Sequence, residues 1–327
     1  MEDELIITSG NGAVYSYNYT NGSMKEIFYS KNDNEYFMGV SKYKDKVIVS
    51  SNYVIYILEE YNNAWICNRY LSWELGKGDD PTFQHVKIIG GKLFAPSLVW
   101  NCIDIIDLEL DDYSLKPSFL YRVSILQTGN RTYYDHINCI FFYKDRYIIN
   151  SSNLCRNTSS SGIIIADNLW NPINSYEYGY NTYGTCVLDD KLYYLCNFDR
   201  EINLGSGLAV GKEMVVKAGN YSLRDFSINN DNIFIVGSAI LNEHKFDRCG
   251  GILIVLDRNF KHLDTIFFPS HGQFMGCMLR NYDLTNEMWN MENLGIENWT
   301  VGYTGSGKDK FIKIKKLDTK SKFVGIE

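Results

Sequence analysis

Phe37-Met38-Gly39-Val40 is the first copy of a four-residue phrase that recurs along this chain. Each copy has a large apolar residue, any residue, a small or polar residue and then an apolar residue. The later copies are Phe83-Gln84-His85-Val86, Ile137-Asn138-Cys139-Ile140, a looser one at Tyr183-Gly184-Thr185, Leu223-Arg224-Asp225-Phe226, Phe274-Met275-Gly276-Cys277 and Phe323-Val324-Gly325-Ile326. Their third positions, with Gly184 taken for the looser copy, are 41 to 54 residues apart. A near-constant step of this size indicates a repeat architecture.

The segment after each phrase contains short runs rich in apolar and β-branched residues, separated by turns of Gly, Asn and Asp. After Gly39, for example, a turn at Lys44-Asp45 is followed by runs at 46–51, 54–59 and 65–71. Such runs are typical of strands joined by hairpins. Four strands in a unit of about 45 residues form one blade of a β-propeller. The sequence therefore predicts an all-β fold in which residues 1–327 form a single propeller domain.

The spacing predicts seven blades. Five steps lead from Gly39 to Gly276, and the roughly 90 residues left to close the ring correspond to two more steps. The phrase at Gly325 would then pair with N-terminal strands, so that one blade is built from both termini. A six-bladed ring with a long insertion is the alternative, because only the runs at 299–303 and 311–316 follow the inner strand at Gly276. Residues 281–297, with a weak helical periodicity, are the expected insertion.

Charge and composition exclude several classes of partner. The net charge of −7 argues against a nucleic-acid-binding surface. No apolar run approaches the ~20 residues that a membrane helix needs. The N-terminus, Met1-Glu2-Asp3-Glu4, is acidic where a secretory signal is basic, and the eight cysteines include no C-x-x-C pair. We therefore expect a cytoplasmic protein with reduced thiols and no membrane partner.

The third position of the phrase is expected to face the central axis of the propeller, where space is short. Glycine stands there at 39, 184, 276 and 325, whereas His85, Cys139 and Asp225 depart from the rule. One explanation is a hydrated channel in which water satisfies polar groups. The other is a functional site, with His85, His136 and Asp225 as candidate catalytic residues. Cys139 is expected to be a buried strand thiol rather than a nucleophile.

Other polar residues are candidates for ligand binding at the same end of the axis. Arg224 could orient an anion, and strand alternation would place Asn138 on the same face as His136. Asn150 and Asn197 fall in the loops that follow second strands, and Trp100 could stack on a sugar or a base. The sequence predicts no cofactor and no transition-metal site, because no local spacing of ligands supports one. The sequence is also compatible with a divalent cation bound by Asn and Asp side chains at the channel mouth.

The chain resembles the β-propeller superfamily over nearly its whole length, through spacing rather than a signature. It lacks the repeated motifs of WD40 and kelch blades. The phrase Asp135-His136-Ile137-Asn138 is similar to inner-strand motifs in stand-alone NHL-like and lyase-like propellers. Propellers serve unrelated functions, so the resemblance implies a fold and not an activity.

Two functions fit these observations. The first is a binding module that presents a polar axial pocket or loop face to a small polar ligand or a protein. The alternative is a lyase or hydrolase acting on a small polar or anionic substrate at an axial His/Asp/Arg site. Convergence of His85, His136 and Asp225 in a pocket open to solvent would favour the enzyme. Their separation, or a plug of aromatic side chains over them, would favour the binding module.

Overall fold

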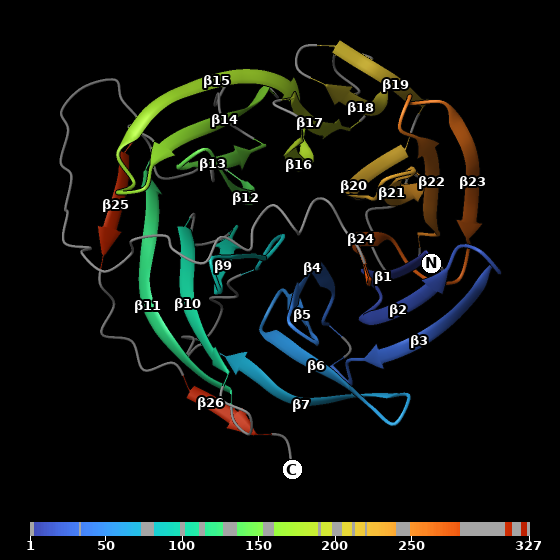
Figure 1. Ribbon diagram of the computed structural model, residues 1–327, viewed down its shortest axis with the longest axis horizontal. Helices are drawn as coiled ribbons and strands as arrows, with labels where there is room; N and C mark the ends of the chain where they lie inside the picture. The colour runs from blue at the N-terminus through green and yellow to red at the C-terminus, as the bar shows by residue number, and fades with distance from the viewer. Residues whose placement is uncertain are drawn as a thin grey trace.

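The computed structural model arranges the chain as a ring of sheets around one axis (Figure 1). Within the described residues the strands form six sheets, which follow one another around the axis in chain order. Each sheet is a blade, so the protein is a six-bladed β-propeller. The described residues are 3–32, 34–72, 82–98, 102–110, 115–126, 136–152, 160–188, 191–197, 205–210, 213–219, 221–239, 249–281, 311–315 and 322–325.

The first three blades contain the two ends of the chain. Blade 1 consists of β24 (Phe274–Leu279), β1 (Glu4–Ser9), β2 (Ala13–Asn18) and β3 (Ser23–Tyr29), from the axis outward. Blade 2 consists of β4 (Phe37–Tyr43), β5 (Lys46–Ser51), β6 (Ile55–Tyr61), β7 (Ala64–Ser72) and β26 (Lys322–Gly325). Blade 3 consists of β8 (Lys87–Ile89), β9 (Lys92–Ser97), β10 (Cys102–Leu110), β11 (Leu115–Leu126) and β25 (Phe311–Lys315).

The other three blades are continuous in sequence, and each has four antiparallel strands. Blade 4 consists of β12 (Ile137–Tyr143), β13 (Arg146–Ser151), β14 (Ser160–Asp167) and β15 (Pro172–Tyr180). Blade 5 consists of β16 (Tyr183–Leu188), β17 (Lys191–Cys196), β18 (Ser206–Val210) and β19 (Glu213–Gly219). Blade 6 consists of β20 (Tyr221–Ile228), β21 (Asn232–Ala239), β22 (Gly251–Asp257) and β23 (His262–Phe268).

The ring closes in blade 1, where β24 pairs with β1 and Cys277 lies opposite Ile7. The predicted seventh inner strand at Gly325 is not found at the axis. Instead, Phe323 lies opposite Leu71, and β26 extends the outer edge of blade 2. A four-residue apolar pattern is compatible with an outer strand as well as with an inner strand. For this reason the phrase at Gly325 led to a prediction of seven blades instead of six. The six-bladed alternative is the one that the structure supports.

The other late segments fall into different places. The expected strand at 311–316 lies outside β11 in blade 3 as β25. The run at 299–303 and the expected insertion, from residue 282 onward, lie outside the described residues.

The recurring phrase is a β-bulge in the inner strand of each blade. In blade 4, Ile137 pairs with Ser151 and Cys139 with Asn150, so Asn138 is an extra residue. A bulge bends its strand and re-aims the neighbouring side chains, so simple alternation does not hold there. Extra residues at the equivalent places are Met275 in blade 1, one of residues 38 and 39 in blade 2, one of residues 84–86 in blade 3, Gly184 in blade 5 and Arg224 in blade 6.

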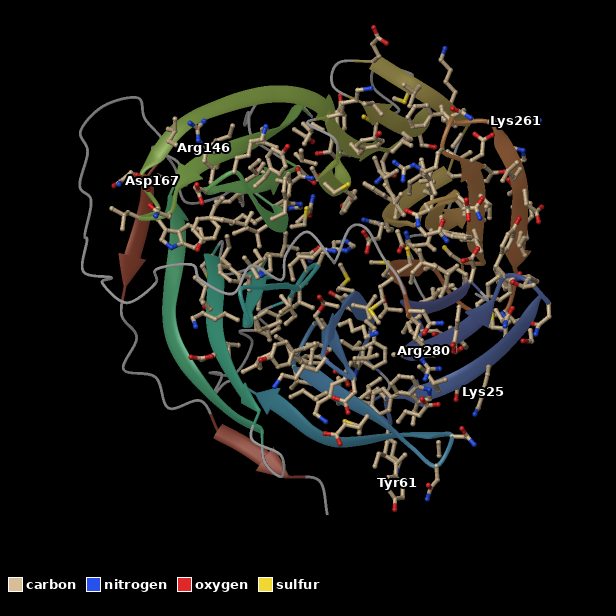
Figure 2. All side chains as sticks on the ribbon, in the orientation of Figure 1. Lys25, Tyr61, Arg146, Asp167, Lys261 and Arg280 are labelled. Carbon is tan, nitrogen blue, oxygen red and sulfur yellow. The ribbon has the colours of Figure 1, made fainter. Side chains whose placement is uncertain are left out.

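Apolar side chains fill the space between neighbouring blades (Figure 2). Between blades 3 and 4, the buried rings of Tyr147 and Trp170 stack with centroids 3.9 Å apart, and Phe94 packs against both. Burying an aromatic side chain of this size contributes about 2 to 3 kcal/mol. This packing makes the ring a scaffold that fixes the inner strands relative to one another.

Candidate functional site

The inner strands approach one another at the third position of the phrase. A Cβ atom on Gly39 in blade 2 would lie 2.6 Å from the Cα of His85 in blade 3. A Cβ atom on Gly276 in blade 1 would lie 2.7 Å from the carbonyl oxygen of Met38. Both distances are too short for a side chain. Backbone contact between neighbouring strands, rather than a wide channel, therefore explains the glycines in blades 1 and 2.

His85 and Asp225 meet across the axis. They belong to blades 3 and 6, which are opposite one another in a six-bladed ring (Figure 1). Nδ1 of His85 lies 3.3 Å from Oδ2 of Asp225, and the two side chains are 2% and 5% exposed. The contact has an ion-pair distance, although no acceptor is well aligned with Nδ1. Oδ2 also accepts a 3.2 Å hydrogen bond from the backbone N–H of Cys277 in blade 1. This pair links three blades and closes the axis at its level.

The surroundings of Asp225 favour its ionised form. Burial by itself raises the pKa of a carboxyl group. The charges of His85 and Lys87 and the Cys277 N–H outweigh this effect, so that the pKa of Asp225 is held below its ordinary value. Lys87 is 8% exposed, two residues after His85, and was not among our sequence candidates. Its place directly after the phrase that contains His85 could have suggested it.

Cys139 is not an activated thiol. Its side chain is 1% exposed, and burial raises its pKa to about 11. The thiol therefore stays protonated near neutral pH, as expected for a thiol buried in a strand.

The three candidate asparagines join neighbouring blades. Asn138 donates from Nδ2 to the Thr182 carbonyl oxygen at 2.7 Å and to the Ser152 hydroxyl. Asn150 accepts a 3.0 Å hydrogen bond from the Thr182 hydroxyl. Asn197 accepts one of 2.6 Å from the backbone N–H of Leu223. These side chains connect blade 4 with blade 5 and blade 5 with blade 6, so all three form hydrogen bonds within the protein.

Tyr183 and Arg224 lie together at the end where the inner strands begin, and with the half-buried His136 of blade 4 they are here called the axial cluster. The guanidinium carbon of Arg224 lies 4.4 Å from the ring centroid of Tyr183. The Asn138–Thr182 hydrogen bond connects the chain next to His136 with the chain next to Tyr183. All three side chains are half-buried. Tyr183 was not a sequence candidate, although its place at the start of a phrase could have suggested it.

The His136 side chain is not part of the axial pair, although the backbone N–H of His85 donates to the Asn138 carbonyl oxygen, two residues further along the chain, at 3.1 Å. Its backbone has a φ of 50°, and its carbonyl oxygen accepts a 3.0 Å hydrogen bond from the Ser152 N–H. Burial lowers the pKa of its imidazole. In the described structure no hydrogen bond or ion pair joins His136 to His85 or Asp225. The three predicted catalytic residues therefore divide into an enclosed pair and a half-buried histidine.

The remaining sequence candidates are quickly placed. Trp100 lies outside the described residues. Within the residues that are described, no group of three or more His, Cys, Asp or Glu side chains could hold a metal ion. A search of the same residues found no helix long and apolar enough to cross a membrane.

Comparisons with known proteins show the fold and no family. No family model matches the sequence, and no curated protein matches it. Among solved structures, a protein of unknown function from Bacteroides caccae is 13% identical, with a TM-score of 0.58 over 86% of this chain and 100% of that one. A chain of a nidogen/laminin complex is 10% identical, with a TM-score of 0.56 over 85% of this chain and 98% of that one. At such low identities the likeness concerns architecture, and it agrees with the β-propeller seen here.

Proposed function

We propose that this protein is a binding module: the blade ring is a rigid scaffold, and a small polar ligand binds at the axial cluster. The observation that carries the proposal is the enclosure of His85 and Asp225. Their side chains are 2% and 5% exposed. A general acid or base must come within hydrogen-bonding reach of its substrate. With so little exposed surface, neither side chain is open to a substrate from solvent.

The axial cluster has the properties expected of a ligand site. It combines a cation, an aromatic ring and an imidazole, all half-buried and all on or directly before inner strands of neighbouring blades. Small-molecule sites commonly consist of a few polar groups held against apolar or aromatic surface. The packed ring would hold these groups in place before the ligand arrives, which lowers the entropic cost of binding.

The test is a ligand-observed NMR screen with citrate, inorganic phosphate and glucose as probes. We expect at least one probe to bind the wild type, and Tyr183→Ala to weaken its binding about tenfold, equivalent to about 1.4 kcal/mol. Tyr61→Ala is the matched control, because Tyr61 is 66% exposed and points away from the ring (Figure 2). Equal binding of each probe to all three proteins would argue against a site at the axial cluster.

An enzyme acting at the same cluster is the second candidate. The lowered pKa of His136 supports it, since a neutral imidazole can accept a proton near pH 7. The measurement is conversion of a bound probe, followed by NMR. Conversion by the wild type that is lost in His136→Gln and retained in His262→Gln would favour catalysis. Binding without conversion would leave the binding module as the better description.

A further inference from the structure

Arg224 is a half-buried cation that has no anionic partner among the described residues. In the described structure its guanidinium contacts the Tyr183 ring but makes no hydrogen bond and no ion pair with a carboxylate. Its Nε is fully buried and has no acceptor. Removing a charged group from water without a compensating partner is unfavourable. A group placed in this way has unused capacity to bind an anion.

Arg280 shows how the same protein satisfies an arginine of structural importance. Arg280 also lies over an aromatic ring, that of Trp65, at 5.2 Å. It donates to both carboxylate oxygens of Glu4, at 3.0 and 2.9 Å, and pairs with Glu60. The chain has 39 acidic and 32 basic residues, so carboxylates are not scarce. Within the described residues, Arg224 therefore differs from Arg280 in having no carboxylate to pair with.

The carboxylate nearest to Arg224 in sequence does not fill this role. Asp225 faces the axis, where it is engaged by His85 and by the Cys277 N–H. The bulge at Arg224 separates the two side chains, because Leu223 and Asp225 pair with successive residues of β21 while Arg224 is the extra residue. Arg224 is thereby directed to Tyr183 instead of to the axial pair.

We propose that Arg224 and Tyr183 bind the oxyanion of a small ligand, a carboxylate or a phosphate group. This inference rests on the proposed binding function and specifies the class of its ligand. A guanidinium presents parallel N–H donors that match two oxygens of such a group. The Tyr183 ring, 4.4 Å from the guanidinium carbon, would hold the cation in place for the anion.

The experiment measures the affinity of the full chain for citrate and for inorganic phosphate by isothermal titration calorimetry. We expect binding of one or both, weakened about tenfold or more by Arg224→Gln. Arg224→Lys keeps the charge but loses the paired donors, so its affinity should lie between those of the wild type and Arg224→Gln. Citrate and phosphate distinguish a carboxylate site from a phosphate site.

Arg146→Gln is the matched control, since it makes the same charge change at an exposed position on the outer part of blade 4 (Figure 2). We expect its affinity to equal that of the wild type. Equal losses in Arg146→Gln and Arg224→Gln would indicate a general charge effect and would overturn the assignment. An unchanged thermal midpoint in Arg224→Lys would separate loss of binding from loss of folding.

The binding data also distinguish the proposed anion site from the proposed binding function as a whole. Glucose binding that depends on Tyr183 but not on Arg224, with no binding of either anion, would overturn the anion site and leave the binding module intact. Failure of both anions and of glucose to bind the wild type would count against both proposals.

Discussion

Asp225→Ala is expected to lower the free energy of unfolding by about 3 to 5 kcal/mol, the range seen when one partner of a buried ion pair is removed. The change removes the anion that faces His85 and the acceptor of the Cys277 N–H. It affects blades 1, 3 and 6 at once, because these groups meet at the axis. The measurement is urea denaturation followed by tryptophan fluorescence at neutral pH.

Asp231→Ala is the control on the same blade. Asp231 lies exposed in the turn between β20 and β21, so Asp231→Ala should change the free energy of unfolding by no more than about 0.5 kcal/mol. A similar small loss for Asp225→Ala would mean that the axial pair does not hold the ring together.

The same carboxylate predicts a dependence on pH. The folded-state pKa of Asp225 lies below its ordinary value of 3.8, so the unfolded chain takes up this proton at higher pH than the folded chain. Its stabilising contribution is therefore complete above the ordinary pKa and is lost as the pH falls through the lowered one. The wild type should have a higher free energy of unfolding than Asp225→Asn at neutral pH, and this difference should disappear in acid. An advantage that did not change with pH would contradict this assignment.

Gly39→Ala is expected to cost about 3 kcal/mol, near the upper end of the usual cost of overpacking. The added Cβ would lie 2.6 Å from the His85 Cα and 2.9 Å from the Gln84 carbonyl oxygen. These are backbone atoms, and they are held firmly. The Ser50 hydroxyl accepts a 2.9 Å hydrogen bond from the Gly39 N–H and donates one of 2.6 Å to the Gln84 carbonyl oxygen. Ser50 therefore connects the backbone at Gly39 with the backbone at Gln84.

The control for Gly39→Ala is Gly205→Ala, where the closest atom to the new Cβ would be 3.4 Å away. That distance is nearly ordinary van der Waals contact, and the substitution should change stability by less than about 1 kcal/mol. Thermal unfolding measured by circular dichroism compares the two variants. Equal midpoints for both would show that the inner strands can move apart easily.

The all-β repeat could be predicted from the sequence because each blade is a local unit with its own hairpins. The number of blades could not, since closure depends on which late segment returns to the axis. Gly276 and Gly325 carry the same phrase, yet β24 is an inner strand and β26 an outer one. A phrase of four residues records that a segment is a strand but not which edge it joins.

The contact between His85 and Asp225 could not be predicted for a related reason. The two residues are 140 positions apart, and both were expected to face the axis. They meet because blades 3 and 6 are directly opposite in a ring of six. A ring of seven has no opposite pair. The bulges were also not predicted, because the alternation of strand residues does not reveal an extra residue, and they decide that Arg224 and Asp225 face different groups.

Ligand binding at the axial cluster, outside the enclosed His85–Asp225 pair, is tested most directly by NMR of the five histidines during a citrate titration. We predict that citrate shifts the ring signals of His136 and leaves those of His85 unchanged. In Arg224→Gln, citrate should shift neither histidine. Shifts at His85 without shifts at His136 would place the ligand inside the axis and would contradict a site at the axial cluster.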